Sequence, residues 1–156
     1  MTLAAEVLDA ARGRGVMIAT AESCTGGLIV GALTEVPGSS DAVDRGFVTY
    51  SNNAKMQMLG VRSETLQTHG AVSEAVAAEM AAGALRHSDA GIVVAVTGIA
   101  GPGGSEQKPE GRVCFGVAQP YGTRTETIEF GAIGRQRVRQ ATVEHALQLL
   151  LDALRP

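Results

Sequence analysis

The 156-residue chain is short of aromatic residues and cysteine, and it lacks long apolar runs. It contains no Trp, and two Tyr and three Phe are too few to build a core, which must pack with aliphatic side chains. Cys24 and Cys114 do not suffice for a disulfide framework or a zinc site. No apolar run approaches the roughly 18 residues of a membrane-spanning helix. The sequence therefore predicts a protein without a metal site and without a membrane partner.

The chain is also short of positive charge. Thirteen Lys and Arg against sixteen Asp and Glu give a net charge of −3, which disfavours a nucleic-acid binder held by general positive charge. Residues 1–15 contain Glu6 and Asp9 and lack the apolar stretch of a signal peptide. We expect a single cytoplasmic domain over residues 1–156 with no nucleic-acid partner.

Glycine, by contrast, is abundant. Twenty glycines make up about 13% of the chain, against a usual ~7%. This surplus either loosens the fold or builds a functional site. The positions of the glycines decide between these two alternatives.

The pattern of apolar residues alternates between strands and helices. Buried strands are predicted at residues 16–19, 47–50 and 92–96, and a hairpin at 113–118 and 123–130. Helical spacing of apolar residues predicts helices at residues 3–11, 28–36, 54–59, 74–86 and 138–154. The alternation indicates an α/β fold with a mixed, mainly parallel sheet of about five strands.

The first candidate site is the segment AESCTGG at residues 21–27, between the first predicted strand and its helix. Ligands of open α/β sheets bind at such edges. Ser23 could cap the N-terminus of this helix. A capping box would require Glu or Gln three residues later, and that residue is Gly26. Two glycines in a first helical turn cost up to about 1 kcal/mol each relative to alanine. Either this helix packs closely on the sheet, or bare N–H groups approach a ligand oxygen.

Several side chains in and near this segment are candidate nucleophiles. Ser23 is one, and Cys24 is another because a helix N-terminus lowers a thiol pKa. The three histidines are scattered without metal or triad spacing, so a serine would need another base, such as a lysine with a lowered pKa. Lys55 is either solvated or held near neutrality for such a purpose. Ser51 precedes Lys55 by four residues and is a rival nucleophile.

Two further segments are candidate binding sites. The loop TGIAGPGG at residues 97–104 continues to Gly111 and matches neither the phosphate-loop nor the dinucleotide fingerprint. A loop of this length after a strand is uncommon unless it is functional or disordered, and a plain flexible crossover is the alternative. Arg135, Arg137 and Arg139 lie around the start of the last predicted helix, where arginines suit a phosphate. A solvated basic face is the alternative there.

Taken together, five segments resemble the CinA C-terminal domain family. They are AESCTGG at 21–27, GFVTYSN at 46–52 with Lys55, GAVSE at 70–74, TGIAGP at 97–102, and Gly134-Arg135 with Arg139. The resemblance covers nearly the whole chain. It implies a three-layer α/β/α fold, a homo-oligomer, and a serine/lysine amidohydrolase that needs no metal or cofactor.

The resemblance also implies a reaction and a set of site residues. The reaction is hydrolysis of the carboxamide of nicotinamide mononucleotide to nicotinic acid mononucleotide and ammonia, in pyridine-nucleotide salvage. The implied catalytic residues are Ser23, Lys55 and Tyr50. The implied substrate-binding residues are Thr25, Gly26, Gly27, Thr97, Gly98, Gly101, Arg135 and Arg139.

Under this hypothesis, neutral Lys55 takes the Ser23 proton, Ser23 attacks the amide carbon, and Tyr50 relays a proton. Backbone N–H groups of residues 25–27 stabilise the oxyanion. Seven glycines would then lie in segments that face the substrate: Gly26, Gly27, Gly98, Gly101, Gly103, Gly104 and Gly111. Two other interpretations stay open, a non-catalytic nucleotide-binding or regulatory module of the competence/damage-inducible type, and a cysteine enzyme that uses Cys24.

Overall fold

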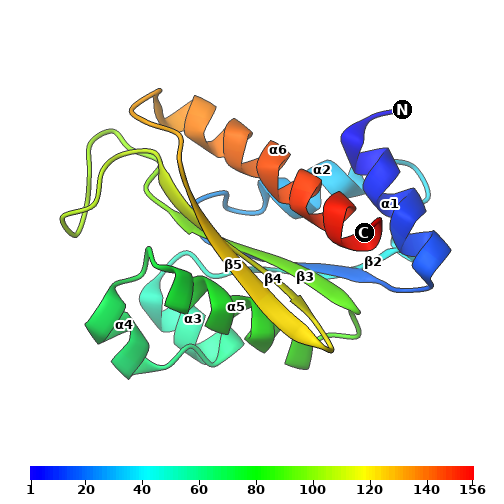
Figure 1. Cartoon of the computed structure of the whole chain (residues 1–156), viewed down its shortest axis with the longest axis horizontal. Helices are drawn as coiled ribbons and strands as arrows, with labels where there is room; N and C mark the ends of the chain where they lie inside the picture. Colours follow the sequence, from blue (N-terminus) through cyan, green and yellow to red (C-terminus); the bar gives the residue numbers. More distant parts are fainter.

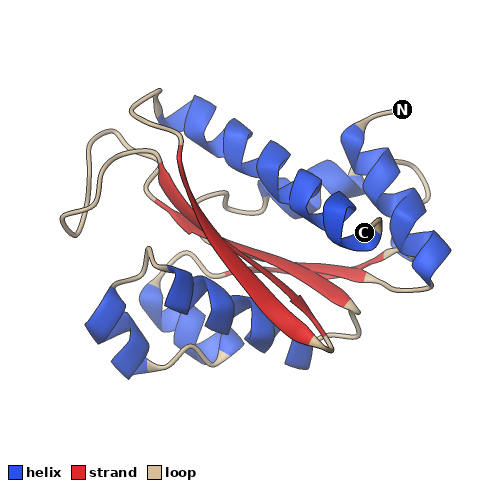
Figure 2. Cartoon of the chain, viewed as in Figure 1, coloured by secondary structure: helices blue, strands red, loops and turns tan.

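In the computed structural model, which describes residues 1–156, five strands form one mixed sheet in the order β2-β1-β3-β4-β5 (Figures 1 and 2). The strands are β1 (Ile18–Glu22), β2 (Val43–Val48), β3 (Ile92–Gly98), β4 (Arg112–Gln119) and β5 (Gly122–Glu129). β1 pairs in parallel with β2 and β3, whereas β3–β4 and β4–β5 are antiparallel. Only β4 therefore runs against the other strands. The predicted mixed sheet and its hairpin are confirmed.

Helices cover both faces of the sheet. They are α1 (Leu3–Arg14), α2 (Leu28–Thr34), α3 (Asn52–Leu59), α4 (Ser63–His69), α5 (Glu74–Arg86) and α6 (Arg135–Leu154), with a 3₁₀ turn at Ser39–Asp41. α1, α2 and α6 lie on one face, and α3, α4 and α5 lie on the other (Figure 1). The expected three-layer α/β/α fold is confirmed. No helix is both long enough and apolar enough to cross a lipid bilayer.

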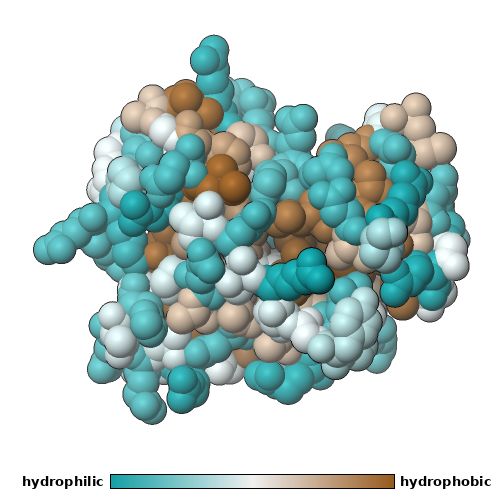
Figure 3. Space-filling model, viewed as in Figure 1, coloured by the Kyte–Doolittle hydropathy of each residue, from teal (hydrophilic) through white to brown (hydrophobic).

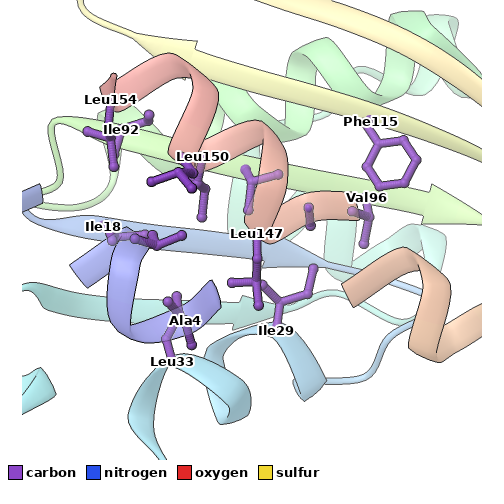
Figure 4. Close-up of a cluster of buried hydrophobic side chains, with 14 of the residues drawn as sticks. Ala4, Ile18, Ile29, Leu33, Ile92, Val96, Phe115, Leu147, Leu150 and Leu154 are labelled. Atoms are coloured by element: carbon purple, nitrogen blue, oxygen red, sulfur yellow. The ribbon is translucent and has the colours of Figure 1, made fainter. Parts of the chain in front are cut away.

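Aliphatic side chains fill the space between the sheet and the α1, α2 and α6 layer (Figure 4). The pleat of the sheet sends Ile18 of β1 into this core and Ala19 to the opposite face, toward α5. Small residues on that opposite face allow close approach of the helix. A Cβ at Gly116 would lie 2.7 Å from the Ala77 carbonyl oxygen, and one at Gly83 only 1.9 Å from that of Leu59. Part of the glycine surplus is therefore explained by packing.

α2 begins at Leu28, as predicted, but the structure corrects the expected place of the two glycines in its first turn. Gly26 and Gly27 lie before the helix with φ of +58° and +103°, in a turn that precedes Leu28, so they are not in the first helical turn. A left-handed backbone favours glycine because it has no Cβ. β1 is also longer than predicted at its carboxyl end, because it includes the buried polar residue Glu22.

Two other elements differ from the prediction for identifiable reasons. β2 begins four residues before the predicted strand. The charged residues Asp44 and Arg45 interrupt the apolar pattern there, so the start of this edge strand is not predicted. α4 was not predicted, because its seven residues carry little apolar periodicity. A tertiary contact supports it instead: the Glu79 carboxylate of α5 accepts hydrogen bonds from the Arg62 N–H and the Thr65 hydroxyl.

Candidate active site

A cavity of about 390 Å³ opens at the carboxyl ends of β1 and β3. The chain leaves β1 for β2 on one side and returns to β3 on the other, and such a reversal of strand order is where open α/β sheets bind ligands. Ser23, Lys55 and Thr97 line the cavity with buried side chains, whereas Tyr50 and Arg135 line it with exposed ones. The volume falls within the range of about 300–1,000 Å³ that is typical of small-molecule sites.

The structure brings Ser23 and Lys55 together. Lys55 lies on α3, whose first turn is capped by Ser51, and its Nζ is 3.0 Å from Ser23 Oγ. The same Nζ lies 3.1 Å from the Thr49 carbonyl oxygen and 3.5 Å from that of Tyr50. The Lys55 side chain is only 2% exposed and forms no ion pair. Desolvation by burial therefore lowers the pKa of Lys55.

The Glu22 carboxylate organises the turn that contains Ser23. Glu22 is fully buried at the end of β1, and its side chain accepts five hydrogen bonds. The donors are the hydroxyls of Thr20 and Thr25 and the N–H groups of Gly27, Ile29 and Val30. The N-terminal end of α2, a natural anion site, is therefore filled by a carboxylate of the chain itself.

This arrangement changes the expected role of residues 25–27. None of Thr25, Gly26 and Gly27 lines the cavity. The Gly27 N–H donates to Glu22, and the Gly26 N–H donates to the Ser23 carbonyl, so neither is free to bind a substrate oxygen. The N–H groups of Ser23 and Cys24 make no hydrogen bond within the chain, and both residues line the cavity.

At the rim of the cavity, Arg135 links two segments that are distant in the sequence. It is the first residue of α6, and its guanidinium donates to the Gly101 carbonyl at 2.7 Å and to the Tyr50 hydroxyl at 2.9 Å. Tyr50 is 62% exposed and is the only aromatic residue that lines the cavity. No hydrogen bond joins its hydroxyl to Ser23 or Lys55.

Thr97 and Gly98 lie at the end of β3 and line the cavity, as does Gly101 in the loop that follows. The Thr97 hydroxyl donates to the Ala71 carbonyl at 2.8 Å, which ties β3 to the segment before α5. Of the seven glycines expected to face the substrate, four line the cavity: Gly98, Gly101, Gly103 and Gly104. Gly111 packs against Gly131 instead, where a Cβ would lie 2.1 Å from a carbonyl oxygen.

Arg139 lies one helical turn after Arg135 but does not line the cavity. Its Nε is 3.1 Å from the Cys24 carbonyl oxygen, and its Nη2 is 3.2 Å from that of Thr25. Arg139 therefore holds the turn of residues 23–27 through its carbonyl groups.

Sequence reasoning missed three charged residues that shape the loop of residues 99–111. Lys108 donates to the carbonyls of His69 and Val72, which joins the loop to the segment between α4 and α5. Glu110 accepts from the N–H groups of Gly103 and Gly134, which joins it to the start of α6. Glu106 adds a carboxylate to the cavity lining. Their positions in a long loop gave no local signal, because their partners lie elsewhere in the chain.

The structure weakens the two rival nucleophiles. Burial raises the pKa of the Cys24 thiol to about 11, so this thiol stays protonated near neutral pH. Ser51 does not line the cavity, and its hydroxyl accepts the Ala54 N–H as the cap of α3. No group of three or more His, Cys, Asp or Glu side chains is placed to hold a metal ion.

Comparison with known proteins gives one family. The model of the CinA C-terminal domain matches residues 1–154. The chain is 50% identical over 151 residues to the nicotinamide-nucleotide amidohydrolase PncC of Escherichia coli K12, covering 96% of this chain and 92% of that protein. It is 56% identical over 146 residues to a CinA-like protein of Chlorobium phaeobacteroides, covering 90% of this chain and 35% of that longer protein.

Solved structures give the same result. The competence/damage inducible protein CihA of Agrobacterium tumefaciens superimposes with a TM-score of 0.94 at 53% identity, covering 99% of this chain and 94% of that one. A competence damage-inducible protein A from Klebsiella pneumoniae also superimposes with a TM-score of 0.94, at 42% identity. The sheet order and the two helical layers therefore belong to an established fold.

Replacing Lys55 with methionine tests whether the fold lowers the pKa of this amine. At a pH below the pKa of Lys55 in the folded chain, Lys55 is protonated in both the folded and the unfolded chain. The cost of burying its charge then lowers the free energy of unfolding in full. Between that pKa and the ordinary value near 10.4, only the unfolded chain holds this proton, so the free energy of unfolding rises by up to about 1.4 kcal/mol per pH unit. Lys55→Met lacks this dependence. In urea unfolding from about pH 7 to 10, wild type should gain stability relative to the variant, whereas a constant difference would contradict a lowered pKa.

Proposed function

This chain belongs to the CinA C-terminal domain family, and we propose that it hydrolyses the carboxamide of nicotinamide mononucleotide to nicotinic acid mononucleotide and ammonia. The substrate is suggested by the PncC relative, which aligns with this chain over 92% of its own length. The small cavity suits a mononucleotide, and its buried part holds a serine beside a lysine. We assign Ser23 as the nucleophile and Lys55 as the base.

The contact that carries this assignment is the one between Lys55 Nζ and Ser23 Oγ. A neutral amine has two N–H groups and one lone pair. The carbonyls of Thr49 and Tyr50 accept the two N–H groups, which leaves the lone pair to accept the Ser23 hydroxyl proton. Burial of an amine that forms no ion pair favours this neutral form, as a general base requires, and it outweighs the opposing effect of the Glu106 carboxylate on the lysine pKa.

The reaction then proceeds in two halves. Ser23 Oγ bonds to the carboxamide carbon while its proton passes to Lys55. The carbon–nitrogen bond breaks, and the Lys55 ammonium returns the proton to the departing nitrogen, which leaves as ammonia. Water attacks the resulting ester and gives a proton to Lys55, the carbon–Oγ bond breaks, and Ser23 recovers its proton. Tyr50 is still predicted to assist proton transfer.

Ser23→Ala and Lys55→Arg should both abolish ammonia release from nicotinamide mononucleotide, with kcat lower by at least about 1,000-fold. Arginine fails as a base because it stays protonated. Ser51→Ala is the matched control: it removes a nearby serine, costs about 1 kcal/mol of stability as a lost cap, and should leave kcat within a few-fold. A chelator should not reduce the wild-type rate.

Retained turnover in Ser23→Ala would contradict the assigned nucleophile and return Cys24 to consideration. Ligand binding without any turnover in wild type would favour the regulatory alternative.

We assign Arg135 as the residue that binds the phosphate of the substrate. It is exposed at the cavity rim, while the reacting groups are buried, so a nucleotide can place its phosphate at the rim and its amide inside. Its planar guanidinium suits a phosphate. The N–H groups of α2 are not available for this purpose because Glu22 occupies them.

Arg135→Ala should raise KM for nicotinamide mononucleotide about 10- to 100-fold, as expected for the loss of a charged hydrogen bond. KM for the riboside, which has no phosphate, should change little. Arg137→Ala, on the same helical turn but away from the cavity, is the control. An equal loss on both substrates would argue against a phosphate contact.

We further propose that two copies of the chain associate through β5. This strand is an edge of the sheet, and every second residue of an edge strand turns its N–H and C=O groups outward. Figure 3 shows polar side chains along this face, with apolar ones recessed beside α6. If the β5 strands of two copies pair antiparallel with Thr125 opposite Thr125, Arg124 of each copy lies opposite Glu126 of the other. The two-fold symmetry of the dimer therefore gives two such charge pairs.

Charge reversal tests this pairing. Arg124→Glu and Glu126→Arg each place like charges opposite one another and should shift the protein toward monomer, whereas the double variant restores opposite charges and the dimer. Light scattering after size-exclusion chromatography measures the mass. A monomeric wild type, or single variants with unchanged mass, would contradict the pairing.

The expected cytoplasmic location stays a prediction.

A further inference from the structure

Glu22 takes no part in the proposed reaction, although it adjoins Ser23 in the chain and its carbonyl contacts Thr49, a partner of Lys55. We infer that Glu22 is a positioning residue that fixes Ser23 and Lys55 relative to one another. The inference rests on the proposed assignment of these two residues. Three observations carry it: the donors around the Glu22 carboxylate, the partners of its backbone, and the N–H groups that it leaves free.

The carboxylate is surrounded by donors. Oε1 accepts from the Thr25 hydroxyl at 2.6 Å, the Gly27 N–H at 3.2 Å and the Ile29 N–H at 2.9 Å. Oε2 accepts from the Thr20 hydroxyl at 3.0 Å and the Val30 N–H at 2.9 Å. Four of these bonds tie the turn of residues 23–27, or the start of α2, to the end of β1, and the bond from Thr20 lies within β1. The turn is therefore held by a rigid strand.

The backbone of Glu22 reaches the other half of the site. Its carbonyl accepts from the Thr49 N–H at 2.8 Å and from the Thr49 hydroxyl at 3.3 Å. The Thr49 carbonyl in turn accepts from Lys55 Nζ. One residue thus holds the Ser23 turn through its side chain and the support of Lys55 through its main chain.

Glu22 also determines which N–H groups can meet the substrate. It takes those of Gly27, Ile29 and Val30, which leaves the N–H groups of Ser23 and Cys24 without a partner beside the cavity. Two adjacent N–H groups at the nucleophile are suited to stabilise the oxyanion of a tetrahedral intermediate. The orientation of both depends on the turn that the carboxylate holds.

A purely structural role would be the simpler explanation, since a buried carboxylate with five donors also stabilises the fold. The two roles differ in what a small displacement does. A shift of about 1 Å in a reacting group costs on the order of 100-fold in rate without unfolding the protein. A structural residue lowers stability and leaves the rate of the folded fraction unchanged.

The test uses Glu22→Gln, which keeps the side-chain size but turns an amide NH₂ toward N–H donors. Two rates are measured well below the melting temperature: ammonia release from nicotinamide mononucleotide, and labelling of Ser23 by a fluorophosphonate, followed by intact mass across pH. We expect kcat and the labelling rate to fall 10- to 100-fold, with KM changed less than about threefold.

Thr25→Val supplies a second variant in case Glu22→Gln does not fold. It removes one donor to Oε1 without leaving a buried amide, and it should lower both rates, whereas Thr25→Ser keeps the hydroxyl and should recover most of the loss. Thr142→Val is the stability control, because Thr142 is a buried threonine of α6 whose hydroxyl bonds only the Val138 carbonyl. It should lower stability and change neither rate.

Each outcome decides the inference. Unchanged labelling in Glu22→Gln, or an equal loss in Thr142→Val, would overturn it. Wild-type protein that labels at Ser23 but releases no ammonia would refute the proposed substrate, while a labelling loss in Glu22→Gln would still support the positioning role. Wild-type protein that does not label at Ser23 would overturn both the nucleophile and the positioning role.

Discussion

A buried lysine that forms no ion pair is the constraint on which the candidate site depends. Lys55 and Glu22 are both buried, and an ion pair between them would raise the lysine pKa. The structure prevents this, because five donors surround the Glu22 carboxylate while Lys55 faces carbonyls and a hydroxyl. Two residues of opposite charge type are therefore both buried, and neutral groups satisfy the side chain of each. The turn that contains Ser23 separates their environments.

The glycine surplus has three uses rather than one. Four glycines bring the backbone at the end of β3 and in the loop that follows to the cavity. Gly26 and Gly27 adopt left-handed conformations that let the turn wrap around the Glu22 carboxylate. Gly83 and Gly116 allow α5 to approach α3 and β4 at backbone distance. None of these uses loosens the fold, because each glycine is placed where a side chain would collide or the backbone would be strained.

The sequence predicts the parts of this structure that depend on local patterns. Local patterns predict β3 from its β-branched run, the hairpin of β4 and β5, and α5. They do so because buried strands, turns and amphipathic helices each have a regular pattern of apolar and turn residues. Local patterns do not predict the contact between Ser23 and Lys55. Spacing alone leaves Ser51 as a rival nucleophile, and only the family resemblance selects Ser23 and Lys55 as the pair. The sequence also gives no indication that the N–H groups of Gly26 and Gly27 have acceptors within the chain. The acceptor of the Gly27 N–H is a buried glutamate, and polar pairing across a turn has no periodic pattern.

The cavity keeps the phosphate-binding residue at its rim and the reacting groups in its buried part, and this separation keeps Lys55 uncharged. A phosphate near Lys55 would stabilise its ammonium form and raise its pKa, which would remove the proton acceptor. Binding the phosphate at the exposed rim, against Arg135, keeps this negative charge beside a positive one and away from the buried amine. The two opposite charges largely cancel at the distance of the reacting atoms. An uncharged amide then meets an uncharged amine, which is the condition that Ser23 needs to lose its proton.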